Sequence, residues 1–217
     1  MSGQLSVGIP GVPVFAVIDT ETSGLSASAH RVVEVGVCVT DIEFAPLATW
    51  HTMINPQAPV TNSHIHGLGV EDLVRAPVFA EIAATLAGQL EGLRAIAHNA
   101  GFDARFLDAE YARLNTAFCT DPQFSWIDSL QIARQLVPTP HNLASLCTRL
   151  KITNPLPHAA LGDAISTAGV LAGLRTQHAS RLGEQLLATT VAYRASLCKG
   201  LPPQREAYQR GLITQLT

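Results

Sequence analysis

The chain has 217 residues, of which 47% are hydrophobic and 14% charged, and a formal net charge of -3. This composition is typical of a folded globular protein and excludes a disordered chain, and the length suits one well-packed domain with a small appendage. No apolar run approaches the roughly 18 residues that span a bilayer, and the N-terminus lacks the basic flank and cleavage pattern of a signal peptide. We therefore expect a cytoplasmic protein with no membrane partner.

The distribution of charges and cysteines argues against several kinds of protein. Residues 1–174 contain 8 Lys and Arg against 15 Asp and Glu, a net charge of -7, whereas residues 175–217 contain 6 against 2, a net charge of +4. A protein that grips duplex DNA by phosphate neutralisation alone usually has a basic body, and this chain does not. The four cysteines are widely scattered and show no C-x-x-C spacing, so the sequence indicates neither a zinc site nor a disulfide framework.

Hydrophobic periodicity and turn residues predict alternating strands and helices. A strand opens the stretch 15–25, and two β-branched strands follow closely enough to form an antiparallel meander with it. Four helices and two short strands come next. A loop at 155–163 then runs into a helix to about residue 177. The expected bounds are strands at 31–40, 48–54, 94–97 and 124–127, and helices at 78–90, 98–115, 129–136, 143–150 and 181–199.

Two carboxylates stand where the opening strand ends, at Asp19 and Glu21. Side chains two residues apart on a strand point the same way, so both would lie on one face. Like charges that close repel unless a cation lies between them, and carboxylate oxygens are the ligands that Mg²⁺ and Mn²⁺ select. The alternative is a strand-end turn with two solvated acids.

Three later residues complete an inventory for phosphodiester chemistry. Asp103 falls in the first turn of a helix, where an acid also suits the helix dipole. His158 and Asp163 are five residues apart, so they converge only if the histidine lies on the loop before the helix. Four carboxylates can hold two metal ions that clamp the attacking and leaving oxygens, and a histidine can accept a proton from water near neutral pH.

Three segments resemble the motifs of a known enzyme family. The stretches 18–25 (IDTETSGL), 98–103 (HNAGFD) and 158–163 (HAALGD) resemble the Exo I, Exo II and Exo III motifs of the DEDDh exonucleases in order and spacing. This family includes the proofreading subunit of bacterial DNA polymerase III. In the sister DEDDy branch a tyrosine stands four residues before the last aspartate, where this chain has Ala159. Ser23 replaces the threonine of many members.

The resemblance implies an α/β fold, ribonuclease H-like, with a mixed five-stranded sheet flanked by helices and a helical C-terminal extension. Residues 1–177 would form the exonuclease domain and residues 178–217 the extension. It also implies two Mg²⁺ or Mn²⁺ ions as cofactors, with His158 as general base. The metal ligands would be Asp19, Glu21, Asp103 and Asp163, and the terminal nucleotide would contact Thr22, Leu25, His66, Asn99 and Phe102.

The implied activity is 3′–5′ hydrolysis of single-stranded DNA that releases nucleoside 5′-monophosphates, in proofreading or repair. The partners would be single-stranded 3′ ends, with DNA favoured over RNA, and a DNA polymerase subunit is a further candidate partner. An exoribonuclease of the same family remains an alternative, because the sequence does not reveal the contacts that sense a 2′-hydroxyl. An inactive module that binds nucleic acid or a polymerase is the alternative from another class.

Overall fold

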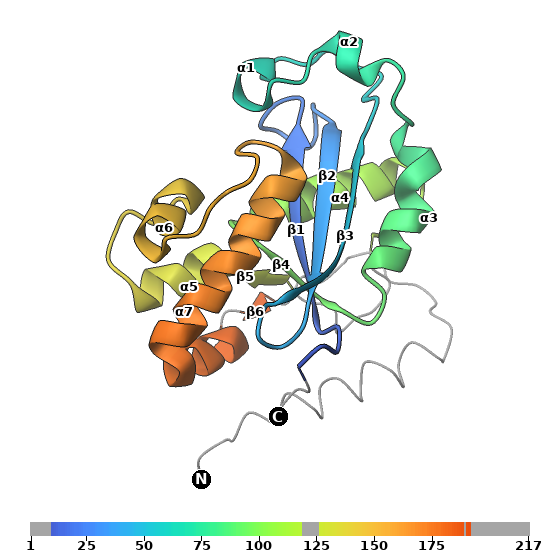
Figure 1. Ribbon diagram of the computed structural model, residues 1–217. Coiled ribbons are helices and arrows are strands. Elements are labelled where there is room, and N and C mark those ends of the chain that lie inside the picture. Colours follow the sequence, from blue (N-terminus) through green and yellow to red (C-terminus); the bar gives the residue numbers. More distant parts are fainter. Residues whose placement is uncertain (1–9, 119–125, 189, 192–217) are drawn as a thin grey trace.

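A mixed β-sheet forms the centre of the computed structural model, which describes residues 10–118, 126–188 and 190–191 (Figure 1). The strand order is β3-β2-β1-β4-β5-β6. The first three strands form the predicted antiparallel meander, whereas β4 and β5 run parallel to β1. The strands are β1 (Phe15–Thr22), β2 (Val32–Thr40), β3 (Pro46–Met53), β4 (Arg94–Ala97), β5 (Trp126–Asp128) and β6 (Thr190–Val191).

Helices cover both faces of this sheet, as alternation along β1 requires. Ala16 and Ile18 pack in one apolar cluster with residues of α3 and α4, whereas Phe15 and Val17 pack in a second cluster with residues of α5, α6 and α7. The result is the helix-sheet-helix layering of an α/β domain. The helices are α1 (Ser63–His66), α2 (Val70–Leu73), α3 (Phe79–Gln89), α4 (Ala100–Arg113), α5 (Ser129–Leu136), α6 (Leu143–Leu150) and α7 (Ala160–Ala188).

Local sequence accounts for several helix starts. The Asp128 carboxylate accepts the Leu130 N–H at 2.9 Å, and the Asn142 side chain accepts the Ser145 N–H at 2.9 Å. Both contacts satisfy backbone donors that a helix leaves unpaired in its first turn. The starts of α5 and α6 therefore follow the caps read from the sequence.

The C-terminal part differs from the prediction within the described residues. Helix α7 breaks its helical geometry at His178, next to the predicted end near residue 177, and resumes as predicted, but it ends at Ala188 instead of continuing to about residue 199. Thr190–Val191 then pairs antiparallel with β5 as a sixth, two-residue strand. A run of β-branched residues favours a strand over a helix, which explains the change. The rest of the predicted extension lies outside the described residues.

The predicted fold class is confirmed, since the five principal strands form the expected mixed sheet and helices flank it. Several boundaries shift by one or two residues; β3, for example, begins at Pro46 and pairs with Thr40 there, two residues earlier than expected. Among the described residues, no helix is both long and apolar enough to cross a membrane. The division at residue 177 stays a prediction, although the break in α7 falls next to it.

Candidate metal centre

Asp19 and Glu21 lie at the carboxyl end of β1, in the middle of the sheet. Their positions alternate with buried residues of the opposite face, so both carboxylates point toward the layer that contains α7. This arrangement confirms the shared face expected from the D-x-E spacing. The two acids therefore occupy the end of a central strand, where they are half-buried on the face that α7 covers.

Asp163 reaches the same place from the first turn of α7. One carboxylate oxygen from each of Asp19, Glu21 and Asp163 lies within 4.8 Å of the others. The Asp163 Oδ1 atom also accepts a hydrogen bond of 2.6 Å from the Asn154 side-chain amide. Three acids that are distant in sequence thus meet in one cluster, which we call the carboxylate cluster.

Asp103 lies beside this cluster on the α4 side. Its side chain is 3% exposed, and its Oδ1 atom accepts hydrogen bonds from the Thr20 N–H at 3.0 Å and the Thr20 hydroxyl at 2.8 Å. The charge of Asp103 contributes to the raised pKa of Asp19, which places the two carboxyl groups in the same electrostatic environment. Thr20 therefore anchors the fourth predicted ligand against β1.

The pKa values of these acids reflect burial and mutual repulsion. Burial, followed by repulsion from Asp103 and Asp163, raises the pKa of Asp19 well above its usual range. Burial and repulsion, chiefly from Asp163, raise the pKa of Glu21 to about 8. Burial raises the pKa of Asp103 to about 7, although hydrogen bonds from Thr20 oppose the shift. In each case the protein alone disfavours the charged form.

The donor set fits hard divalent cations. All four candidate ligands are carboxylates, which Mg²⁺ and Mn²⁺ prefer. Among the described residues, no Lys, Arg or His forms an ion pair with Asp19, Glu21 or Asp163. A bound cation would therefore supply the charge compensation that the protein does not supply, and would return the raised pKa values toward the ordinary range.

His158 lies on the loop just before α7, as its spacing from Asp163 requires. Its side chain is exposed, and its backbone has a φ of 62°, in the left-handed region. Residues other than glycine are uncommon in that region, and such conformations concentrate at functional sites. The structure thus places His158 on an exposed loop five residues before Asp163, and its role as general base stays a prediction.

Four of the predicted nucleotide contacts lie in two segments, the end of β1 with its following loop and the start of α4. Thr22 is buried and its hydroxyl donates to the Gly24 carbonyl at 2.8 Å, whereas Leu25 is 77% exposed on the loop after β1. Asn99, at φ 72°, precedes α4 and donates its N–H to Asp128 at 3.1 Å. Phe102 is half-buried against Phe106. A contact of any of these residues with a nucleotide stays a prediction.

His66 ends the short helix α1 and is the fifth predicted nucleotide contact. Its Nδ1 atom accepts the Leu68 N–H at 3.1 Å, and burial lowers the pKa of the imidazole. A neutral His66 therefore carries its proton on Nε2, which is buried. The imidazole is thus held against the backbone of Leu68, and a contact of His66 with a nucleotide stays a prediction.

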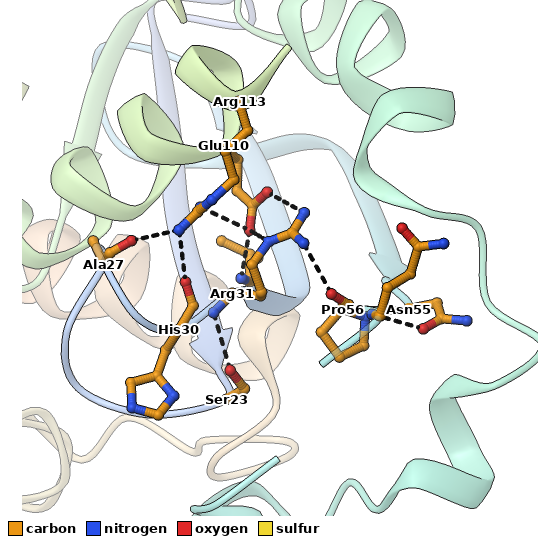
Figure 2. Close-up of polar contacts among 10 residues, drawn as sticks. Ser23, Ala27, His30, Arg31, Asn55, Pro56, Glu110 and Arg113 are labelled. Atoms are coloured by element: carbon orange, nitrogen blue, oxygen red, sulfur yellow. Dashed lines mark hydrogen bonds and ion pairs between the residues drawn. The ribbon is translucent and has the colours of Figure 1, made fainter. Parts of the chain in front are cut away.

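The loop that presents Leu25 is anchored to α4 through a buried carboxylate, as Figure 2 shows. Glu110 is 1% exposed and accepts hydrogen bonds from Arg31 Nε at 2.8 Å, Arg31 Nη2 at 2.7 Å and the Val32 N–H at 3.1 Å. Arg113 Nη1 lies 3.5 Å from the same carboxylate. Charged donors on both sides thus satisfy Glu110.

The two arginines extend this anchor to the backbone of the loop (Figure 2). Arg113 Nη2 donates to the carbonyls of Ala27 at 2.7 Å and His30 at 3.2 Å. Arg31 donates its N–H to the Ser23 hydroxyl at 3.0 Å. Both ends of the segment between Ser23 and Arg31 are therefore fixed, which restrains the exposed Leu25 between them.

Two residues near the cluster were not singled out from the sequence. Glu34 is a buried acid within β2, directly opposite Glu21 in the strand register. Asn154 lies in the loop before α7 and orients Asp163. A lone glutamate inside a run of valines was a usable signal for Glu34, because an ionisable residue is rarely fully buried without a partner. The sequence offered no comparable signal for Asn154.

Comparison with known proteins agrees with this arrangement. The exonuclease (RNase_T) family model matches residues 16–171. The DNA polymerase III subunit epsilon of Pasteurella multocida is 35% identical over 164 residues, which cover 71% of this chain and 65% of that protein. The Escherichia coli subunit epsilon is 31% identical over 159 residues, covering 68% and 65%. The chain thus spans about 65% of the length of these relatives.

Solved structures share the fold. Exonuclease X in complex with 5′-overhanging duplex DNA has a TM-score of 0.62 and 24% identity, over 76% of this chain and 93% of that one. The nuclease domain of 3′hExo, a DEDDh member bound to rAMP, has a TM-score of 0.65 and 14% identity, over 76% and 92%. With a family model that matches most of its length, the chain belongs to the exonuclease family, as its three motifs predicted.

Proposed function

We propose that the protein is a divalent-metal-dependent 3′–5′ exonuclease that removes nucleotides from single-stranded DNA ends and releases nucleoside 5′-monophosphates. The observation that carries this proposal is the carboxylate cluster, in which ligand atoms from Asp19, Glu21 and Asp163 lie within 4.8 Å of one another. Asp103 adds a fourth carboxylate beside them. Two Mg²⁺ or Mn²⁺ ions held there would activate the attacking water and stabilise the charge on the leaving oxygen.

The residues of the chain divide the remaining work. His158, exposed on its loop, accepts the proton of the attacking water on an imidazole nitrogen. A new phosphorus–oxygen bond forms as the bond to the 3′ oxygen of the preceding nucleotide breaks. That 3′ oxygen then takes up a proton and becomes a free hydroxyl. Leu25 and Phe102 border the terminal nucleotide and orient its phosphate toward the cluster.

DNA is the proposed substrate because the similar relatives are named as DNA polymerase subunits. Proofreading or repair in the cytoplasm, alone or with a DNA polymerase, belongs to the same proposal. The alternative of an exoribonuclease draws support from 3′hExo, whose structure contains rAMP. An inactive binding module is disfavoured, because all five positions of the catalytic inventory are filled.

The test is degradation of matched 5′-labelled DNA and RNA oligomers, single-stranded and duplex, with Mg²⁺ or Mn²⁺. We expect stepwise shortening from the 3′ end on single-stranded DNA, 5′-monophosphate products, and no reaction in EDTA. Asp163→Asn is the matched control for a contaminating nuclease, because it changes one ligand and nearly preserves side-chain volume. Full activity in EDTA would contradict this proposal. Faster cleavage of RNA than of DNA would support the exoribonuclease alternative instead.

A further inference from the structure

Glu34 is a buried carboxylate that borders the carboxylate cluster without belonging to it. It is 5% exposed, lies on β2, and pairs in register with Glu21 of β1. Among the described residues, the group of acids with ligand atoms within 4.8 Å of one another comprises Asp19, Glu21 and Asp163. A buried acid at this place needs its own explanation, because burial of a charge is costly unless it is paired.

Both oxygens of Glu34 have partners within the protein. Its Oε2 atom accepts the backbone N–H of Ala160 at 3.0 Å, and its Oε1 atom lies 3.1 Å from Nε2 of His51 on β3. Ala160 is the first residue of α7. The glutamate therefore connects the sheet to the start of the helix that carries Asp163. The contact is made at Ala160, two residues after His158.

The start of α7 lacks a capping side chain of its own. A helix leaves its first N–H groups without intrahelical partners, and Ser, Thr, Asp or Asn before the first turn usually accepts one of them. Here that position is Ala159, whose methyl group accepts nothing. Glu34 supplies the missing acceptor from strand β2. Its negative charge also suits the positive end of the helix dipole.

Gly36, on the same face of β2, allows this contact. A Cβ atom at Gly36 would lie 2.3 Å from the backbone nitrogen of Leu161, so the backbones of β2 and α7 approach too closely for any side chain there. One strand thus fixes the beginning of α7 at two points, by close packing at Gly36 and by hydrogen bonding at Glu34. Asp163 follows within the same first turn, where its N–H donates to Ala159 O at 3.0 Å.

We propose that Glu34 is a positioning residue that caps α7 from β2 and thereby sets Asp163 and His158 against Asp19 and Glu21. The inference rests on the proposed function, since it concerns the geometry of that site. It predicts that the ability to accept the Ala160 N–H matters, and that the charge of Glu34 matters far less. It also predicts that Glu34 does not itself hold a metal ion.

Three variants separate these roles. Glu34→Gln keeps an oxygen acceptor of the same reach but removes the charge, Glu34→Ala removes the acceptor, and His51→Ala removes the other partner of Glu34. The first measurement is binding of Mn²⁺ to the substrate-free protein by titration calorimetry. The second is hydrogen exchange at the Ala160 amide, and the third is kcat and KM on a single-stranded oligomer.

We expect Glu34→Ala to weaken Mn²⁺ binding by about 10–100-fold, to speed exchange at Ala160, and to lower kcat with little change in KM. Glu34→Gln should restore most of the Mn²⁺ affinity and of kcat, and His51→Ala should resemble the wild type. Equal losses in Glu34→Gln and Glu34→Ala would show that the charge, or metal ligation, is what matters, and would overturn the inference. Unchanged exchange at Ala160 in Glu34→Ala would also overturn it.

These outcomes are separable from failure of the proposed function. If the wild-type protein degrades no oligomer, the proposed function fails, whereas Mn²⁺ affinity and amide exchange still test the position of Glu34. If the wild-type protein is an active nuclease and Glu34→Ala keeps its metal affinity, its exchange pattern and its kcat, only the inference about Glu34 fails.

Discussion

This domain contains the buried carboxylate of Glu110 and the half-buried carboxylate cluster, and their negative charges are compensated in different ways. Glu110 is held between two arginines of the same chain, and its hydrogen bond raises the pKa of Arg31. Among the described residues, Asp19, Glu21 and Asp163 form no ion pair with a basic side chain. The negative charge of Glu110 is therefore balanced within the folded protein, whereas the charges of the carboxylate cluster are not.

This difference in charge compensation distinguishes an acid with a structural role from acids with a chemical role. A buried acid with fixed cationic partners stabilises a particular loop geometry, and removal of the acid leaves those cations unpaired. Buried acids that repel one another cost stability in the absence of cations and gain it when cations arrive from solution. Ionisable groups with strongly shifted pKa values are typical of functional sites. We therefore expect a structural role for Glu110, and the proposed metal chemistry falls to the carboxylate cluster.

The largest expected effect is on activity, from substitution within the carboxylate cluster. Asp19→Asn should lower the single-turnover rate on a 5′-labelled oligomer by orders of magnitude, because loss of a ligand spoils the metal clamp. The melting temperature of the metal-free variant should stay the same or rise, because one repulsive charge is gone. A variant that cleaves at the wild-type rate would remove Asp19 from the site.

The next effect concerns proton transfer. His158→Asn should lower the rate by about 10²–10⁴-fold, because asparagine cannot act as the base. Asparagine tolerates the left-handed backbone at this position, so we expect the fold and the Mn²⁺ affinity to be preserved. The acid limb of the pH–rate profile should disappear in this variant. An unchanged profile would show that the base lies elsewhere.

Substitution of Glu110 should lower stability, whereas substitution of Asp19 is expected to lower activity and leave stability unchanged or higher. Glu110→Ala should cost about 3–5 kcal/mol of unfolding free energy, because it leaves two arginines without their buried partner. Urea denaturation of the metal-free protein measures this value, with Glu81→Gln on α3 as a control, because it removes one exposed acid but keeps an oxygen that can accept the Val78 N–H. A stability loss no greater than that of the control would contradict the contrast between the two groups.

The smallest effect is a pH dependence of stability. The folded state raises the pKa of Glu21 from 4.5 to about 8, so the folded protein binds more protons than the unfolded chain between these values. Stability of the metal-free protein should therefore fall as pH rises through this window. Mg²⁺ should raise the melting temperature more at pH near 8 than at pH near 5. Glu21→Gln should flatten the profile, and a wild-type profile that rises with pH would contradict the assignment.

The sequence predicted the fold well where local rules decide the structure. Helix α3, strand β4 and the caps at Asp128 and Asn142 follow from periodicity and side-chain chemistry alone. The prediction of a helix through Thr190–Val191 was wrong, because pairing with β5 stabilises those β-branched residues as a strand. That pairing is a tertiary contact, and no local pattern in the sequence reveals it.

The site was predicted as a set of residues, but not as a set of interactions. Asp19, Glu21 and Asp163 meet as the motifs implied. The bond from Asn154 to Asp163 and the bond from Ala160 to Glu34 depend on how α7 docks on β2, which is a property of the assembled fold. Glu110 likewise acquires Arg31 only when α4 packs beside the loop after β1, whereas Arg113 is three residues further along the same helix.

Calorimetric titration of the substrate-free protein with Mn²⁺ tests the central claim most directly, since it measures whether the carboxylate cluster binds divalent cations. We expect saturable binding to the wild-type protein at pH near 7.5, strongly weakened binding to Asp19→Asn and Asp163→Asn, and wild-type binding to Glu81→Gln. Equal binding by all four proteins, or none by the wild type, would contradict the assignment of Asp19, Glu21 and Asp163 to a metal centre.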